Sequence, residues 1–334
     1  AGAKVALLDI DLEKAQQAGR ENVRYLCCDV RALAEMVAPG SVGESVDGLV
    51  QRIRNIGGQP TVYNNYETLL RESRPDVVVV DNFYGEHAPL VAAAFRAGCH
   101  VFAEKPAAAT PEQVAQLYDA WQTAGTQFAT MFNYRYMGSF YGAKRLIDAG
   151  AIGEVRLLNA QKSYKFGTRP DFMTRRSTYG GTIPWVGIHA IDWILWMSGG
   201  RFTSVRASQS AAEAANGVAP ETTALALFEM EGGALASLTV DYLNPAKFPT
   251  HGDDRIRVIG TRGEIEVRDY GITLINADGV QHPENAPDAD LFTDFLRQIE
   301  TGAPCRLSGE ESFAATRAAV LAQTAADTGE TVRF

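Results

Sequence analysis

Hydrophobic and polar positions divide the chain into two parts with different periodicities, which meet near residue 132. In the first part, short apolar runs alternate with stretches whose apolar residues recur every three to four positions, a pattern that predicts strands alternating with helices. Val77–Val80 is an unbroken run of valine, which is typical of a strand buried on both faces of a parallel sheet. The predicted strands are Lys4–Asp9, Thr61–Tyr63, Asp76–Asp81, His100–Ala103 and Gln127–Phe132, and the predicted helices are Tyr66–Ser73, Glu86–Ala97 and a helix from Thr110 to near Gly125.

Strand–helix–strand repetition predicts right-handed crossovers and a doubly wound, Rossmann-type α/β sheet in residues 1–131. Residues 27–60 interrupt the repetition, and we interpret them as an insertion with two short helices joined by glycine-containing loops. The run Lys4–Asp9 follows Ala1 without a preceding glycine-rich turn. Because such a turn is the usual grip on a dinucleotide pyrophosphate, we expect that the first strand and the glycine loop of this sheet are missing from the chain.

From residue 132 onward, alternating apolar and polar positions are joined by short glycine turns, which predicts a mostly antiparallel sheet with one face covered by helices. We therefore expect a dinucleotide-binding domain in residues 1–131 and an α+β domain for substrate binding and oligomerisation in residues 132–334. The predicted strands of the second domain are Val155–Tyr164, Ala224–Met230, Ala234–Tyr242, Arg255–Ile259, Glu264–Val267 and Ile272–Ile275, and its predicted helices are Phe140–Ala149, Asp290–Glu300 and Glu310–Thr328.

Composition and charge exclude several classes of function. Of the 334 residues, 46% are hydrophobic and 21% are charged, which is the balance of a folded protein. The formal net charge is −9 and no run of Lys or Arg is present, which argues against nucleic-acid binding. No apolar stretch is long enough to span a membrane. The cysteines Cys27, Cys28, Cys99 and Cys305 form neither a disulfide framework nor a zinc ligand set, so we predict no metal site and, without a leader, a cytoplasmic location.

Polar side chains follow several predicted strands, at the sheet edge where doubly wound domains bind their ligands. Asp9 is suited to accept hydrogen bonds from an adenosine ribose and to repel a 2′-phosphate, although an acid there can also cap the next helix. Asp81, Asn82 and His87 follow the all-valine strand and either contact a cofactor or form a capped loop.

The strongest single signal is Glu104 and Lys105, which follow the strand His100–Ala103 and precede Pro106. Partial burial at this edge would lower the pKa of the lysine, and such an amine suits acid–base catalysis or the polarisation of a carbonyl.

A further group of polar residues follows Gly180 and Gly181 in the second domain. Trp185, His189 and Asp192 are spaced four and three residues apart, so that on a helix they would share one face. His189 is either a buried core histidine or an acid–base group whose imidazole Asp192 orients.

The order of these motifs resembles the Gfo/Idh/MocA family of NAD(P)-dependent sugar oxidoreductases over nearly the whole chain. The segment Ala97–Pro106 resembles the family pattern Ala-Gly-Lys-His-Val followed by Glu-Lys-Pro, and Gly187–Asp192 resembles the pattern Gly-Val-His-x-x-Asp. The segment Asp81–His87 lies where members carry an Ala-Thr-Pro-Asn…His pattern, but it lacks the Thr-Pro. The segments that carry the resemblance are Asp81–His87, Ala97–Pro106, Phe132–Tyr136, Gly150–Val155 and Gly187–Asp192.

The resemblance implies roles for four residues at matching positions. Lys105 would be the catalytic lysine that holds the reacting hydroxyl, and His189 would be its acid–base partner. Glu104 would lie beside the nicotinamide ribose, and Arg135 would reach the hydroxyls of the substrate. The implied cofactor is NAD, with NADP less favoured because of Asp9.

One departure from the family concerns the acid–base set. Many members carry an Asp four residues before the His, where this chain has Trp185. Either His189 works with Lys105 alone, or Asp192 orients it, or Trp185 stacks on a sugar ring or belongs to the core.

Other residues that could line a substrate pocket are Tyr164, Arg169 and Tyr242. Donors of this kind suit sugar hydroxyls or a carboxylate, but a solvated loop around Arg169 would have the same composition. The segment 247–254 reads as a loop that closes over the site.

These observations leave three hypotheses for the function. The first is an NAD-dependent dehydrogenase of a sugar, sugar acid or polyol. The second is a glycoside lyase or hydrolase that uses transient oxidation by NAD, and the third is a non-catalytic relative that binds a sugar. A bare face of the second sheet also predicts a homodimer or homotetramer.

Overall fold

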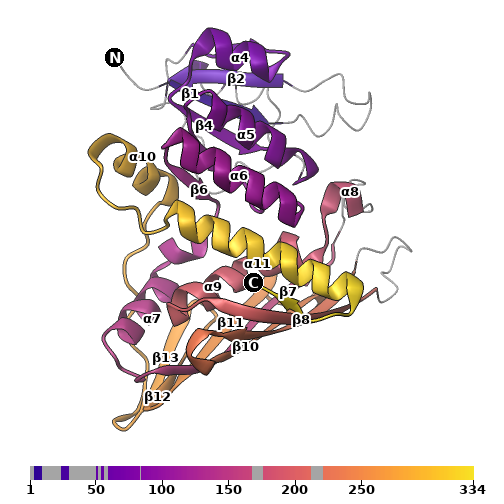
Figure 1. The fold of residues 1–334 in the computed structure, drawn as a ribbon. Coiled ribbons are helices and arrows are strands. Elements are labelled where there is room, and N and C mark those ends of the chain that lie inside the picture. The colour runs from indigo at the N-terminus through magenta and orange to yellow at the C-terminus, as the bar shows by residue number, and fades with distance from the viewer. Residues whose placement is uncertain are drawn as a thin grey trace. The chain divides into compact units, whose positions relative to one another are not determined.

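The computed structural model describes residues 4–9, 24–29, 50–51, 54–55, 59–82, 84–167, 176–211 and 221–334. Contacts within the chain divide it into two compact units, whose elements are labelled in Figure 1. Unit 1 comprises Ala1–Met131 and Leu291–Phe313, and unit 2 comprises Phe132–Asp290 and Ala314–Phe334. Residues 291–313 therefore pack with unit 1, although they lie within the stretch that we predicted as the second domain.

Unit 1 contains a six-stranded sheet with the order β3-β2-β1-β4-β5-β6. Neighbours among β1, β4, β5 and β6 are parallel, whereas β2 runs antiparallel to both β1 and β3. The predicted Rossmann-like sheet is thus confirmed, and β1 pairs directly with β4. The strands are β1 (Lys4–Asp9), β2 (Arg24–Asp29), β3 (Thr61–Tyr63), β4 (Val77–Asp81), β5 (His100–Ala103) and β6 (Phe128–Thr130).

Strand β2 was not predicted. Its sequence Arg-Tyr-Leu-Cys-Cys-Asp contains a short apolar run, which is the signal that we overlooked when residues 27–60 were interpreted as short helices and loops. The pairing of β2 with β1 and β3 is a contact between segments distant in sequence, which such a short run does not specify.

Helices pack on both faces of this sheet. The ring of Phe128 in β6 contacts Phe95 of α5 at a centroid distance of 5.6 Å, whereas Phe102 in β5 contacts Phe292 and Phe295 of α10 at 5.1 and 5.6 Å. Because Val101 and not Phe102 lies beside Phe128 in the parallel ladder, the two phenylalanines point to opposite faces. The helices of unit 1 are α4 (Tyr66–Ser73), α5 (His87–Arg96), α6 (Pro111–Ala124) and α10 (Leu291–Thr301).

Unit 2 contains a nine-stranded sheet with the order β14-β13-β12-β11-β7-β10-β9-β8-β15. Strands β7 and β10 at its centre are parallel, and all its other pairs are antiparallel, as predicted. Strands β8, β14 and β15 were not predicted. The strands are β7 (Val155–Lys165), β8 (Phe202–Ser210), β9 (Thr223–Met230), β10 (Leu235–Asn244), β11 (Gly252–Gly260), β12 (Gly263–Arg268), β13 (Gly271–Asn276), β14 (Gly279–Gln281) and β15 (Val332–Arg333).

One face of this sheet is buried, chiefly under α9, and the other is exposed. In β9 the residues Ala224, Ala226 and Phe228 are at most 3% exposed, while the intervening Leu225 and Leu227 are 58% and 62% exposed. Helix α9 contacts β7, β10 and β11. The helices of unit 2 are α7 (Gly138–Asp148), α8 (Arg176–Tyr179), a π-helical turn (Ile183–Gly187), α9 (Ile188–Ser198) and the C-terminal part of α11 (Gly309–Thr328). None of the helices in the described ranges is long and apolar enough to cross a membrane.

Candidate active site

The predicted cofactor edge of unit 1 is formed by the ends of parallel strands. Asp9 at the end of β1 is paired in register with Asp81 at the end of β4, and Val80 is paired with Ala103 at the end of β5. The backbone N–H of Glu104 donates to the carbonyl of Val80 at 2.7 Å. This register brings the backbone of Asp9, Asp81 and Glu104 to one edge of the sheet.

Lys105 and Glu104 form an ion pair at this edge. Nζ of Lys105 lies 3.9 Å from Oε2 of Glu104, and the backbone N–H of Lys105 donates to the same oxygen at 3.1 Å. The two side chains are 13% and 28% exposed, respectively. The carboxylate therefore orients the amine while both groups keep some access to a bound molecule.

His87 is buried and braces the two loops of the edge. Its Nδ1 lies 2.8 Å from the carbonyl of Pro106, and its Nε2 lies 2.6 Å from the carbonyl of Asn82. Burial lowers the pKa of His87 below the usual value of a histidine, and the two carbonyls oppose this effect. With a side chain at 1% exposure and both ring nitrogens close to backbone carbonyls, His87 supports the loops. The cofactor contact that we predicted for it stays a prediction.

An acceptor at this edge fits a bound nicotinamide cofactor. Oδ1 of Asn82 is buried and has no hydrogen-bond partner among the described residues, while its Nδ2 donates weakly to Glu86 at 3.4 Å. A buried acceptor of this kind needs a donor, and a ribose hydroxyl or a carboxamide N–H can supply one. The described residues therefore fit the nicotinamide end of NAD, although none of them forms a glycine-rich phosphate loop.

In unit 2, aromatic rings hold the imidazole of His189 near the start of α9. The ring centroid of Tyr134 lies 5.3 Å from that of His189 with an interplanar angle of 60°, and Phe132 lies at 6.2 Å with an angle of 82°. Both contacts are edge-to-face, and such contacts restrict the rotation of a ring. His189 is partly exposed, so that it has a surface for a further contact.

Arg135 and Asp192 form a buried ion pair. Nη2 of Arg135 lies 2.7 Å from Oδ1 of Asp192, and Nε lies 3.1 Å from each carboxylate oxygen. Both side chains are 1% exposed. Each charge neutralises the other beneath the surface, which is the arrangement that a buried charge requires. The predicted contact of Arg135 with the substrate, and that of Asp192 with the substrate or with His189, stay predictions.

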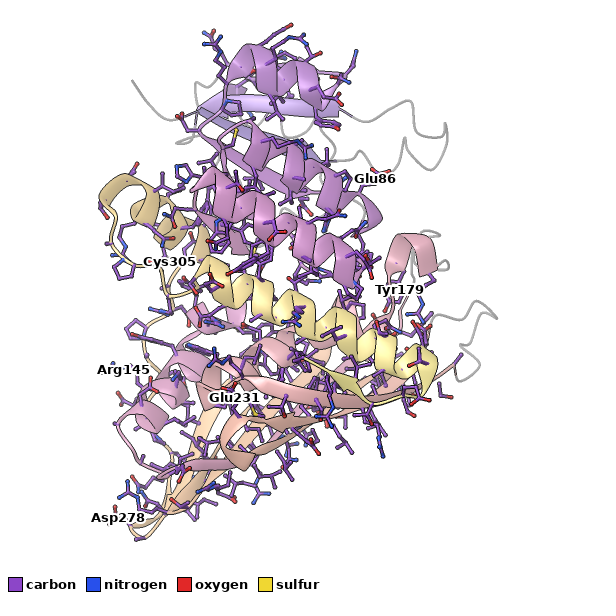
Figure 2. The ribbon with its side chains drawn as sticks, in the orientation of Figure 1. Glu86, Arg145, Tyr179, Glu231, Asp278 and Cys305 are labelled. Atoms are coloured by element: carbon purple, nitrogen blue, oxygen red, sulfur yellow. The ribbon has the colours of Figure 1, made fainter. Side chains whose placement is uncertain are left out.

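Trp185 lies in the π-helical turn before α9. Its ring is tilted on that of Tyr179 at a centroid distance of 5.6 Å. Tyr179 is the last residue of α8 and is labelled in Figure 2. The hydroxyl of Tyr179 lies 2.7 Å from that of Tyr242. Tyr242 is 3% exposed, so its hydroxyl is occupied by Tyr179 and does not face open solvent.

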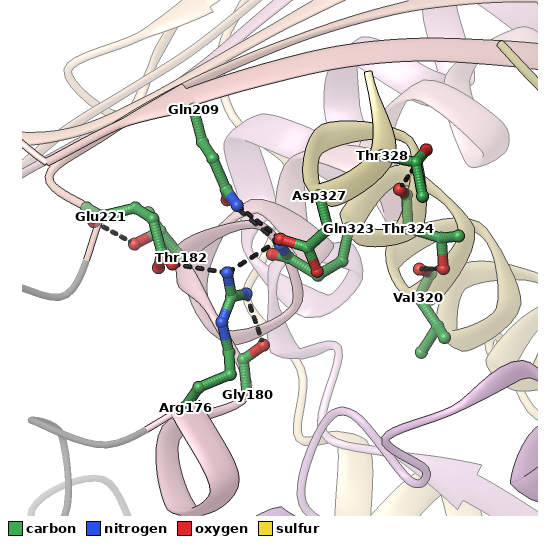
Figure 3. A network of polar contacts seen from close by, with 10 residues as sticks. All are labelled: Arg176, Gly180, Thr182, Gln209, Glu221, Val320, Gln323, Thr324, Asp327 and Thr328. Atoms are coloured by element: carbon green, nitrogen blue, oxygen red, sulfur yellow. Dashed lines mark hydrogen bonds and ion pairs between the residues drawn. The ribbon is translucent and has the colours of Figure 1, made fainter. Parts of the chain in front are cut away.

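Arg176 anchors the segment that leads into this turn (Figure 3). Its guanidinium contacts Asp327 at 3.0 Å and the carboxylate of Glu221, and Nη1 donates to the carbonyl of Gly180 at 3.0 Å. Gly181 follows with a φ of +121°, and a Cβ there would lie 2.4 Å from Oε1 of Gln323. Both glycines have a positive φ, +79° at Gly180 and +121° at Gly181, which is a backbone conformation that suits glycine. Arg169, which we predicted as a substrate contact, lies outside the described residues.

Three polar residues close to His189 were not identified from the sequence: Lys162, Asp254 and the phenol of Tyr134. The side chain of Lys162 is fully buried, with Nζ 2.8 Å from Oδ2 of Asp254 and 2.8 Å from the hydroxyl of Tyr134. Nζ also lies 4.7 Å from the ring centroid of Tyr164, which places this predicted substrate residue in the same cluster.

Alternation in β7 provided a signal for this cluster. Leu158, Ala160 and Lys162 occupy the same buried face, so the lysine stands where an apolar residue is expected. Asp254 was read as part of a loop, but β11 begins at Gly252 and pairs Asp254 directly with Lys162. Among the described residues, no group of His, Cys, Asp and Glu side chains is arranged to hold a metal ion.

Comparison with known proteins adds two domain matches. Residues 50–132 match the model of an oxidoreductase family with an NAD-binding Rossmann fold, and residues 140–266 match that of the GFO/IDH/MocA C-terminal domain. A Thermotoga maritima protein assigned as an oxidoreductase superposes with a TM-score of 0.83 at 38% identity, over 91% of this chain and 97% of that protein.

Two enzymes are similar in sequence. D-glucoside 3-dehydrogenase of Escherichia coli is 29% identical over 190 residues, which are 55% of this chain and 52% of that enzyme. D-xylose 1-dehydrogenase (NADP(+)) 2 of Haloferax volcanii is 27% identical over 295 residues, which are 83% of this chain and 86% of that enzyme. The chain thus spans about half of the first enzyme and most of the second.

Proposed function

Because this chain belongs to the GFO/IDH/MocA family of NAD(P)-dependent oxidoreductases, we propose that it is a dehydrogenase of a sugar or polyol, which transfers a hydride between a hydroxyl-bearing carbon and the nicotinamide ring. The observation that carries this proposal is the Glu104–Lys105 ion pair at the carboxyl edge of β5. The similar enzymes support the class of substrate, because their names specify a glucoside and xylose.

In this proposal Lys105 binds the reacting hydroxyl. An ammonium that donates a hydrogen bond to that oxygen stabilises the negative charge that develops as the proton leaves. Glu104, whose carboxylate lies 3.9 Å from Nζ, holds the lysine in place and neutralises part of its charge. The bound nicotinamide supplies the hydride acceptor, and the chain supplies the proton acceptor.

His189 is the proposed proton acceptor. A neutral imidazole takes the hydroxyl proton while the hydride leaves the same carbon, so that the alcohol becomes a carbonyl and two electrons pass to the cofactor. The edge-to-face contacts of Tyr134 and Phe132 orient the imidazole, and Asp192 carries the ion pair with Arg135.

We also propose NAD as the preferred cofactor. Asp9 ends the strand beside β4, and a carboxylate near an adenosine ribose would repel the 2′-phosphate of NADP. One of the similar enzymes is named for NADP, so both cofactors belong in the assay.

The assay measures NADH or NADPH absorbance with D-glucose, methyl β-D-glucoside, D-xylose and myo-inositol, each with either cofactor. We expect that the wild-type protein reduces NAD with at least one of these compounds, and that Lys105→Met does not. Lys144→Met, which removes the lysine that pairs with Asp148 on helix α7 of unit 2, is the matched control and should keep the activity. No reduction of bound cofactor by any compound would count against the proposal.

The alternative of transient oxidation has one observation in its favour, namely Trp185 at the position of the family's Asp. The same assay distinguishes this alternative from a dehydrogenase, because cleavage of the methyl glucoside without net formation of NADH would identify a lyase or hydrolase.

A cytoplasmic location stays a prediction.

Self-association through the exposed face of the nine-stranded sheet is part of the proposal. Leu225, Leu227, Leu235 and Leu243 are each more than half exposed, and they lie on adjacent strands β9 and β10. A second copy of the chain presents the same apolar patch, so a two-fold axis would cover both.

A further inference from the structure

Lys162, Asp254 and the phenol of Tyr134 form one buried polar cluster, which we call the lysine cluster. Nζ of Lys162 lies 2.8 Å from Oδ2 of Asp254 and 2.8 Å from the phenol oxygen, and the phenol donates to the same carboxylate oxygen. The phenol therefore accepts from the ammonium and donates to the carboxylate. Two hydrogen bonds to charged groups fix its position more firmly than neutral ones would.

The ring of Tyr134 connects this cluster to His189. One side of the ring faces Nζ of Lys162, which lies 4.4 Å from the ring centroid, and the ring also meets Trp193 at 4.8 Å. His189 lies 5.3 Å from the same centroid at an interplanar angle of 60°. Tyr134 thus has its hydroxyl anchored in the lysine cluster and its ring packed against the imidazole.

We infer that Tyr134 is a positioning residue for His189, which holds the imidazole in the orientation for proton transfer because the lysine cluster holds its phenol. This inference rests on the proposed function only for its catalytic consequence, since the orientation of His189 can be measured without a substrate. Lys162 and Asp254 act through Tyr134 and are not assigned a contact with the substrate.

Two observations distinguish this role from ordinary core packing. A core ring needs no charged partners, yet the cluster places a fully buried ammonium and a carboxylate at one phenol oxygen. Burial and the Asp254 carboxylate also raise the pKa of Tyr134, so the phenol remains protonated as a donor throughout the working range of an enzyme.

The test uses NMR of the full chain with isotope-labelled histidine side chains. The chain has five histidines, and His189→Asn identifies the signal of His189 by its disappearance. Tyr134→Phe removes one hydroxyl and leaves the Lys162–Asp254 ion pair intact. We expect the ring signals of His189 to shift and broaden in this variant. Unchanged His189 signals in folded Tyr134→Phe would overturn the inference.

Tyr118→Phe is the matched control, because its hydroxyl donates to Glu310 at 2.9 Å within unit 1. It also removes a phenol that binds a carboxylate, and it should leave His189 unchanged. Asp254→Asn is a second variant, which keeps an acceptor for the phenol but removes the charge that strengthens this hydrogen bond. It should shift the His189 signals in the same direction as Tyr134→Phe, by a smaller amount.

The catalytic consequence is tested by measuring kcat and KM with a compound that the wild-type protein oxidises. We expect Tyr134→Phe to lower kcat by about three- to tenfold at an unchanged KM for NAD, because the phenylalanine ring keeps its contact with the imidazole but loses the hydrogen bonds that fix its orientation. In a His189→Asn background the same change should have no further effect, because residues that act as one unit are not additive. An equal loss in both backgrounds would show that Tyr134 does not act through His189. If His189→Asn kept the wild-type kcat, the proposed acid–base role would fail, while the NMR result would still decide the positioning.

Discussion

The buried ion pair of Arg135 and Asp192 allows a quantitative prediction for unit 2. Both side chains are 1% exposed, and contacts of 2.7–3.1 Å join them. Arg135→Met would leave the carboxylate of Asp192 buried without its counter-ion, which costs about 3–5 kcal/mol of folding free energy. Since each kcal/mol lowers Tm by roughly 2–4 °C in a unit of this size, we expect a loss of roughly 10 °C.

Thermal unfolding followed by circular dichroism measures this loss. Arg201→Met is the matched control, because the Arg201–Glu231 pair has a similar distance of 3.0 Å but side chains that are 82% and 53% exposed. Such a surface pair contributes at most about 1 kcal/mol. The double variant Arg135→Met/Asp192→Leu removes both charges and should recover most of the lost Tm. If Arg135→Met instead kept the wild-type Tm and raised only the KM for the sugar, Arg135 would be a substrate ligand and the ion pair would not stabilise the fold.

Three further predictions concern other parts of the molecule. Leu227→Glu, which places a charge on the exposed face of the sheet, should lower the molar mass measured by light scattering; an unchanged oligomer would exclude this face as the interface. Burial, with a smaller contribution from Asp76, raises the pKa of the Cys99 thiol from 9.0 to about 11. The folded protein therefore keeps a proton that the unfolded chain loses, so the free energy of unfolding should fall as the pH rises from about 9 to about 11, and less so in Cys99→Ala. Gly181→Ala should destabilise the protein by about 1–3 kcal/mol in urea unfolding, because its φ of +121° suits glycine and its Cβ would meet Gln323; an unchanged midpoint would contradict this packing.

Much of the secondary structure followed from local pattern. The all-valine run became β4, with Val77–Val80 at most 6% exposed. The side chain of Thr110 caps α6, at the residue where the sequence predicted this helix to begin. These features depend on residues close in sequence, so a single chain is sufficient to predict them. Strand β2 was missed because a short apolar run does not by itself predict a strand; this run becomes one by pairing with the strands beside it.

The candidate site was predicted only where its chemistry is local. Glu104 and Lys105 are adjacent in sequence and remain adjacent in space, so the motif itself predicted their ion pair. Arg135 and Asp192 are 57 residues apart, and neither of their motifs predicted the buried ion pair that joins them.

Periodicity and short motifs therefore predicted most of the strands and helices, the Rossmann-like sheet and the residues that follow its parallel strands. Which charged side chains are buried, and with which partner, depended on strand register and on the packing of α9. Lys162 shows the reason: its position on the buried face is visible from alternation, but its stability there requires Asp254, 92 residues away on the neighbouring strand. A buried charge is stable only beside its partner, and only the folded chain brings the two together.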